Sequence, residues 1–162
     1  TRYPLVTGVQ TCALPISDAF ISKLKSFRNV KLHGVLQPQE LAKAYRQVDI
    51  FLICYDVKKD QSKGTNYHKI IEFLSTGKVI VSNNVSSYRK YPNLVQMIES
   101  RENNDKLPDL FNSVISNLEN YNNEKLQEER RAFALSNSYE NHVRFIFEKL
   151  TELKKNNQRC VG

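Results

Sequence analysis

The sequence has few cysteines, few histidines and no long apolar run, and each shortage excludes a class of protein. Its three cysteines, Cys12, Cys54 and Cys160, show neither metal-binding nor redox spacing. The three histidines form no metal-ligand cluster with cysteines or carboxylates, so we expect no metal site. No apolar stretch approaches the ~20 residues of a membrane-spanning helix. An odd cysteine count in a chain of this kind favours a reducing, cytoplasmic compartment.

What remains is the composition of a globular domain with an excess of positive charge. The 162 residues suffice for one domain with a core, and 40% are hydrophobic. The formal net charge of +7 favours phosphates, nucleotides or an anionic membrane surface as partners. Lysines scattered along amphipathic helices, however, more often form a solvated face. The aromatic residues are scattered over helix-core positions, so we expect no binding to nucleic acid.

Residues 1–17 differ from the rest of the chain. They show neither a helical nor a strand period, and they lack the charged start and long apolar centre of a signal peptide. The stretch resembles translated sequencing-adapter read-through. We therefore expect a non-native or disordered arm over 1–17, a domain over 18–155 and a polar tail over 156–162.

Helical and strand patterns alternate through this domain, which indicates an α/β fold with a parallel sheet flanked by helices. Cys54 ends an apolar run, and we expect its side chain to be buried there. We predict strands over 30–34, 49–54, 79–81 and 94–98, and helices over 18–27, 38–48, 66–76, 107–121, 124–135 and 138–155.

The strand, loop, helix and strand between residues 49 and 81 form a βαβ unit around which the other elements are arranged. Thr65 or Asn66 can cap its helix, because each carries a short side-chain oxygen. Gly77 stands where a left-handed residue would end the helix. The strand at 79–81 is apolar throughout, which is typical of a parallel strand covered on both faces.

Two charged residues, Lys69 and Glu72, mark the candidate site in this unit. They lie three residues apart near the start of the helix, so they share one helical face. Ligands of βαβ units bind at the carboxyl ends of the strands, beside the helix N-terminus. The free N–H groups and partial positive charge of that terminus suit a phosphate.

The stretch around Glu72 resembles the donor-site signature of glycosyltransferases with the GT-B fold, closest to the retaining class related to sucrose and glycogen synthases. The resemblance implies that Glu72 holds the ribose hydroxyls of a nucleotide sugar, and a carboxylate can accept two hydrogen bonds from such a diol. It also implies that Lys69 and the helix N-terminus, with Thr65 and Asn66, face the diphosphate. The matching pattern reads Asn66-x-x-Lys69-x-x-Glu72-Phe73-Leu74-x-x-Gly77-Lys78-x-x-Val81.

The order of elements before this helix is similar to that family as well. A strand ending at Gly34, a helix and a strand beginning at Asp49 match its pattern, in which the Gly34 turn lies near the nucleotide base. Gly64 stands where many members carry a first glutamate, although subgroups with the Asn-x-x-Lys pattern also lack it. Gly64 and His68 are therefore expected neighbours of the donor. The closing motif of the family is matched by Arg130, Ala134, Asn137, Ser138 and Tyr139.

The resemblance implies that the complete protein is an enzyme that transfers a sugar from a nucleoside-diphosphate sugar to a glycan or lipid-linked acceptor. The donor is a substrate, and neither a cofactor nor a metal is expected. The chain would be a truncated C-terminal half of a GT-B enzyme, Rossmann-like, without the acceptor domain and without a catalytic residue of its own. We therefore expect the isolated chain to be inactive, and we expect the enzyme in the cytoplasm, with peripheral membrane association left open.

The sequence is also compatible with two other functions. One is a nucleotide-sugar epimerase of the same fold, which would release an epimerised sugar nucleotide instead of a glycosylated acceptor. The other is a non-catalytic α/β nucleotide-binding module, in which no pocket would join the Glu72 helix to the Gly34 turn.

Overall fold

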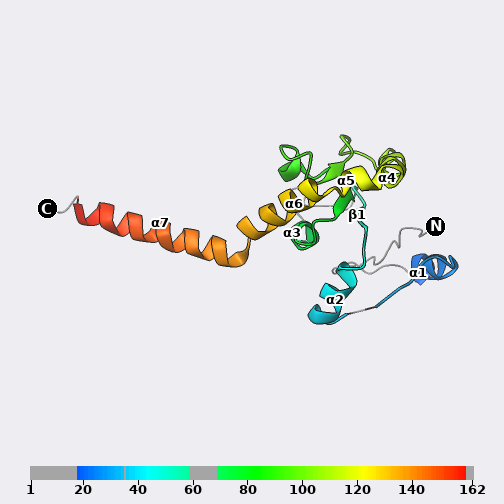
Figure 1. Ribbon diagram of the computed structural model, residues 1–162, viewed down its shortest axis with the longest axis horizontal. Helices are drawn as coiled ribbons and strands as arrows, with labels where there is room; N and C mark the ends of the chain where they lie inside the picture. The colour runs from blue at the N-terminus through cyan, green and yellow to red at the C-terminus, as the bar shows by residue number, and fades with distance from the viewer. Residues whose placement is uncertain (1–17, 35, 59–68, 160–162) are drawn as a thin grey trace.

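The computed structural model describes residues 18–34, 36–58 and 69–159, with side chains as far as residue 154 (Figure 1). Within this part of the chain, three parallel strands form a sheet in the order β1-β2-β3. The strands are β1 (Ile50–Ile53), β2 (Val79–Ser82) and β3 (Gln96–Met97). The α/β class and the parallel sheet flanked by helices are thus confirmed.

The helices occur where the apolar periodicity places them, with a few changes of length. Pro38 is the first residue of its helix, as predicted from its fixed φ angle. The helix expected over 107–121 is instead two helices, because Asn117 leaves the helical conformation (φ −124°, ψ 29°). The helices are α1 (Asp18–Lys25), α2 (Pro38–Tyr45), α3 (Lys69–Leu74), α4 (Leu107–Ser116), α5 (Leu118–Tyr121), α6 (Glu124–Ser136) and α7 (Tyr139–Arg159), with a 3-10 turn η1 (Ser86–Tyr88).

The sheet is covered on both faces, which explains why every residue of β2 is buried. One face packs against α3 and α6, where Ile80 lies in a cluster with Phe73 and Ala134. The other face packs against α4, where Val81 lies in a cluster with Val114. Alternation of side chains along the strand therefore divides the core into two parts.

Three aromatic rings join α2 to the sheet. Phe51 of β1 stacks on Phe73 of α3 at 4.1 Å between ring centroids. Tyr45 of α2 meets both rings edge-on, at 5.4 Å and 5.3 Å. Such edge-to-face contacts add stability beyond the burial of area, so Tyr45 fixes the end of α2 against β1 and α3.

The predicted strand at 30–34 was wrong. These residues adopt no regular structure, and Val30 instead donates a backbone hydrogen bond to Phe27 in a turn. A strand requires a neighbour for its backbone N–H and C=O groups, and no described strand runs beside 30–34. The expected glycine at its end does adopt a left-handed conformation, since Gly34 has φ +68°.

Helix α7 extends away from the sheet (Figure 1). Every side chain from His142 to Lys154 is exposed, including Val143, Ile146 and Leu150, which are 49%, 56% and 50% exposed. These apolar residues follow a helical period, so the helix has an apolar stripe that the described chain leaves exposed. None of the described helices is long and apolar enough to cross a bilayer.

Candidate functional site

Helix α3 begins where strands β1 and β2 end. The two strands are parallel and α3 is the connection between them, so the helix runs back and starts at the carboxyl edge of the sheet. Buried Ile70 and Leu74 anchor it against the core. Gly77 ends it with φ +81°, as the sequence predicts. The position of this helix start agrees with the expected location of the site.

The two charged residues of α3 have different environments. Lys69, the first residue of the described helix, is half-buried at the carboxyl edge. Glu72 lies one turn later and is exposed, and its carboxylate has no hydrogen bond or ion pair with any other described residue. An exposed carboxylate without a partner is able to accept hydrogen bonds from a ligand.

Of the other predicted site residues, Gly34 lies within the described part of the chain. Gly34 is exposed, and no atom lies within 4 Å of the position a Cβ would take there, so its turn is open. The expectations for Gly64, Thr65, Asn66 and His68 lie outside the described residues.

Asparagine side chains connect the loops at the carboxyl edge. Tyr55 N–H, just beyond β1, donates to Asn83 Oδ1 beyond β2 at 3.2 Å. Asn104 Nδ2 donates to the Tyr55 carbonyl at 2.8 Å. The backbone N–H of Asn83 donates to Ile53 O at 3.2 Å and continues the ladder of the sheet. The ends of β1 and β2 are therefore fixed to the loop that precedes α4.

A second asparagine connects β2 to β3 at the same edge. Asn84 Nδ2 donates to the carbonyls of Ile98 and Glu99 at 3.0 Å and 2.8 Å, and Arg89 Nη2 donates to Asn84 Oδ1 at 3.3 Å. The turn-forming residues after β2 make a loop at this edge, which continues into the 3-10 turn η1. The hydrogen bonds made by the side chains of Asn83, Asn84 and Asn104 could not be predicted from the sequence, because asparagine is common in any loop.

Two polar atoms at this edge are buried without a described partner. They are Ser82 Oγ, on a residue with no exposed surface, and Asn104 Oδ1. A buried hydroxyl or amide oxygen without a partner costs about 1–3 kcal/mol. Because neither atom is accessible from the surface, they are a local cost to stability and not surface contacts for a ligand.

Cys54 is exposed, so the prediction of a buried thiol was wrong. Strand β1 ends at Ile53, whose side chain lies in the core, and Cys54 falls on the other face of the strand, where Leu52 is also exposed. Its Sγ accepts a long hydrogen bond of 3.7 Å from Asn104 Nδ2. Partial burial raises the pKa of the thiol, so it is neutral at pH 7 and not an activated nucleophile.

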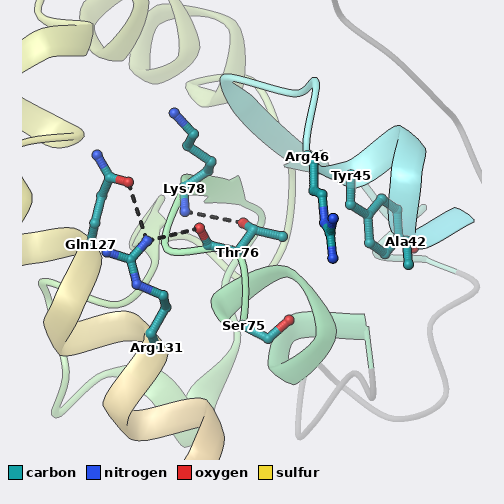
Figure 2. Close-up of a pocket in the computed structure, with 8 residues that line it drawn as sticks. All are labelled: Ala42, Tyr45, Arg46, Ser75, Thr76, Lys78, Gln127 and Arg131. Atoms are coloured by element: carbon teal, nitrogen blue, oxygen red, sulfur yellow. Dashed lines mark hydrogen bonds between the residues drawn. The ribbon is translucent and has the colours of Figure 1, made fainter.

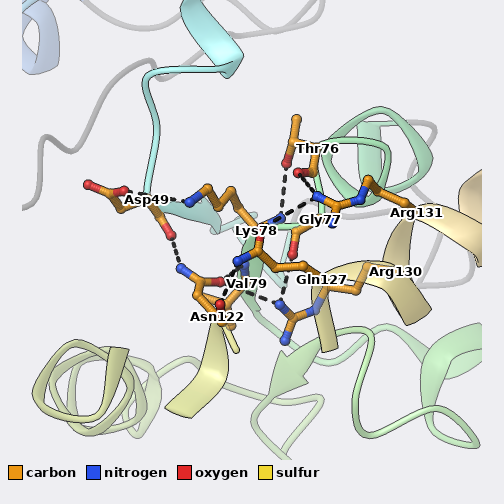
Figure 3. Close-up of polar contacts among 9 residues, drawn as sticks. All are labelled: Asp49, Thr76, Gly77, Lys78, Val79, Asn122, Gln127, Arg130 and Arg131. Carbon is orange, nitrogen blue, oxygen red and sulfur yellow. Dashed lines mark hydrogen bonds and ion pairs between the residues drawn. The ribbon is translucent and has the colours of Figure 1, made fainter. Parts of the chain in front are cut away.

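The opposite, amino edge of the sheet is held by a buried arginine (Figure 3). Arg130 of α6 has no exposed surface; its Nη1 donates to Gly77 O and its Nε to Asn93 O, both at 3.0 Å. Burial lowers the pKa of Arg130 to about 10. Asn122 lies beside it, accepting from Val79 N–H at 2.8 Å and donating to Asp49 O at 2.7 Å.

A pocket of about 520 Å³ lies next to this arginine, at the end of α3 that is remote from Lys69 (Figure 2). Neither Lys69 nor Glu72 lines it. The lining residues come from α2, from the turn between α3 and β2, and from α6: Ala42, Tyr45, Arg46, Ser75, Thr76, Lys78, Gln127 and Arg131.

No family model, curated protein or solved structure matches the chain. Within the described residues, no group of three or more histidines, cysteines and carboxylates is placed to hold a metal ion.

Proposed function

We propose that the chain is the donor-binding part of a GT-B glycosyltransferase, an enzyme that transfers a sugar from a nucleoside-diphosphate sugar to a glycan or lipid-linked acceptor. The observation that carries this proposal is the position of α3. The helix with the signature residues starts at the carboxyl edge of two parallel strands, where nucleotides bind in folds of this type.

The side chains at this edge suit the parts of such a donor. The Glu72 carboxylate, exposed and without a described partner, accepts both hydroxyls of the ribose. The Lys69 ammonium, in the first turn of α3, faces the diphosphate and stabilises its charge as it leaves.

The edge position of β1 supports the proposal that the donor domain of the complete enzyme is larger. Among the described strands, β1 has a neighbour on one side only, so the backbone groups on its other side are free to pair. Doubly wound sheets continue on both sides of the nucleotide site. We propose that further strands pair with β1 and that an acceptor domain completes the active site. This chain alone then binds the donor without transferring the sugar.

Nucleotide binding by this chain tests the proposal. Uridine and guanosine diphosphates are titrated into the wild-type protein, the Glu72→Gln variant and a Glu148→Gln control on exposed α7. Hydrogen bonds to a charged acceptor contribute about 1.5–3 kcal/mol, so Glu72→Gln should weaken binding by at least about tenfold. Glu148→Gln should leave the affinity unchanged.

A modified ligand shows whether the contact is to the ribose. The 2′,3′-dideoxy diphosphate should bind the wild-type protein more weakly than the parent nucleotide, and it should bind Glu72→Gln no differently from the parent. Equal affinities of the wild-type protein and Glu72→Gln for the parent nucleotides would refute the donor site. Products of a longer protein containing this segment separate a transferase, which glycosylates an acceptor, from an epimerase, which releases an epimerised sugar nucleotide.

A further inference from the structure

The pocket at the amino edge of the sheet is strongly basic. Three of its eight lining residues are cationic, Arg46, Lys78 and Arg131, and none is acidic. They come from three separate parts of the chain, the end of α2, the start of β2 and the middle of α6. Their convergence is therefore a product of the fold and not of one charged run along the sequence.

The cations of this pocket are poorly neutralised. Arg131 Nη1 donates to Thr76 O at 3.3 Å and to Gln127 Oε1 at 3.4 Å, and both acceptors are uncharged. The guanidinium of Arg46 has no ion pair within the described residues. Lys78 alone approaches an acid, since its Nζ lies 3.9 Å from Asp49 Oδ1. Two arginines thus keep their full charge toward the pocket.

The two arginines lie on different sides of the pocket. Figure 2 shows Arg46 on the side of α2 and Arg131 on the side of α6, with Ser75 and Thr76 between them. A guanidinium binds phosphate oxygens through a planar fork of N–H groups. Because the cations are separated, they match a ligand with two anionic groups better than a single anion. A volume of about 520 Å³ is within the range of small-molecule sites.

Gly77 keeps one of these cations in place. A Cβ at this position would lie 2.6 Å from Arg131 Nη1 and 3.0 Å from the Gln127 carbonyl. Any other residue would therefore displace the guanidinium from the Thr76 carbonyl. That carbonyl lies at the negative end of α3, and its hydrogen bond with Arg131 reduces the repulsion that an anion would meet there.

From these contacts we propose that the amino edge of the sheet binds a small anion carrying two phosphoryl groups, held between Arg46 and Arg131. This site lies at the opposite end of α3 from the proposed donor site and does not depend on it. Inorganic pyrophosphate is the simplest probe of the required charge and size.

The experiment titrates pyrophosphate into the full chain at low salt and follows the backbone amides by two-dimensional NMR. We expect the largest shifts at Ser75, Thr76 and Lys78. Arg46→Gln should weaken this binding by at least about tenfold, since a charge-assisted contact is lost. The Arg46 side chain has no hydrogen bond or ion pair within the described residues, and circular dichroism is used to check that the variant is folded. The control Arg144→Gln removes the same charge on exposed α7 and should bind like the wild-type protein.

Three results would overturn the proposal. They are the absence of binding, an equal loss of affinity in Arg46→Gln and Arg144→Gln, and shifts confined to the carboxyl edge at Lys69, Asn83 and Asn84. Shifts at both edges, with only those of the amino edge lost in Arg46→Gln, support it. Because the donor site is tested through Glu72 and nucleotides, either proposal can fail while the other stands.

Discussion

Replacing Arg130 by methionine tests whether the buried arginine holds α6 against the α3–β2 turn. The substitution removes the donors to the carbonyls of Gly77 and Asn93, both 3.0 Å away. The buried Gly77 carbonyl left without a donor costs about 1–3 kcal/mol, and the part-buried Asn93 carbonyl costs less. Part of the lost stability is recovered, because the variant no longer buries a cation. The burial of the guanidinium is unfavourable in the wild-type protein, where it lowers the pKa of Arg130 to about 10. We expect a net loss of about 2–4 kcal/mol in the free energy of unfolding.

Urea unfolding followed by circular dichroism measures this loss. The matched control is Arg131→Met on the next position of α6, where the side chain is exposed and its two hydrogen bonds are long, at 3.3 Å and 3.4 Å. We expect the control to lose less than about 1 kcal/mol. Arg130→Lys should fall between, since one ammonium reaches fewer acceptors than the guanidinium fork. Equal midpoints for Arg130→Met and Arg131→Met would show that the buried contacts contribute nothing.

Two further predictions concern Tyr88 and the glycines. Burial raises the pKa of Tyr88 from 10.0 to about 12, so its contribution to stability is complete below pH 10 and is lost as the pH rises toward 12, by about 3 kcal/mol. Alkaline unfolding of Tyr88→Phe should lack this loss, and a Tyr88→Phe profile identical to that of the wild-type protein would contradict it. Gly77→Ala should destabilise by about 3 kcal/mol, through its φ of +81° and the clash with the Gln127 backbone carbonyl, 3.0 Å from the new Cβ. Gly34→Ala, at φ +68° in open space, should cost about 1 kcal/mol in thermal unfolding. Equal costs at the two glycines would refute the role of the clash.

The helices and the central strands could be predicted because their signals are local. Apolar spacing identifies α6 and α7, a continuous apolar run identifies β2, and Gly77 and Pro38 mark helix ends through their backbone preferences. The position of α3 at the carboxyl edge also follows, since two parallel strands must be joined by a crossover. The roles of Glu72 and Lys69 remain predictions.

The parts that could not be predicted depend on contacts distant in the sequence. An arginine in a polar helix gives no sign that it is buried, because the carbonyls that accept from Arg130 lie 53 and 37 residues earlier. Asn104 likewise meets Tyr55 across 49 residues. The segment 30–34 has the composition of a strand, but composition does not supply a pairing partner. The basic pocket required the fold to bring α2 beside α6 and the end of α3.

Helix α7 is a 21-residue element whose exposed part shares no core with the sheet. In proteins, most of the stability of a helix comes from the packing of its apolar face against other elements. The backbone hydrogen bonds of α7 can therefore open and close while β1, β2 and β3 stay folded. The helix then unfolds locally, as a separate cooperative unit. Protection of its amides from exchange with solvent thus depends on whatever covers Val143, Ile146 and Leu150, and not on the global stability of the domain.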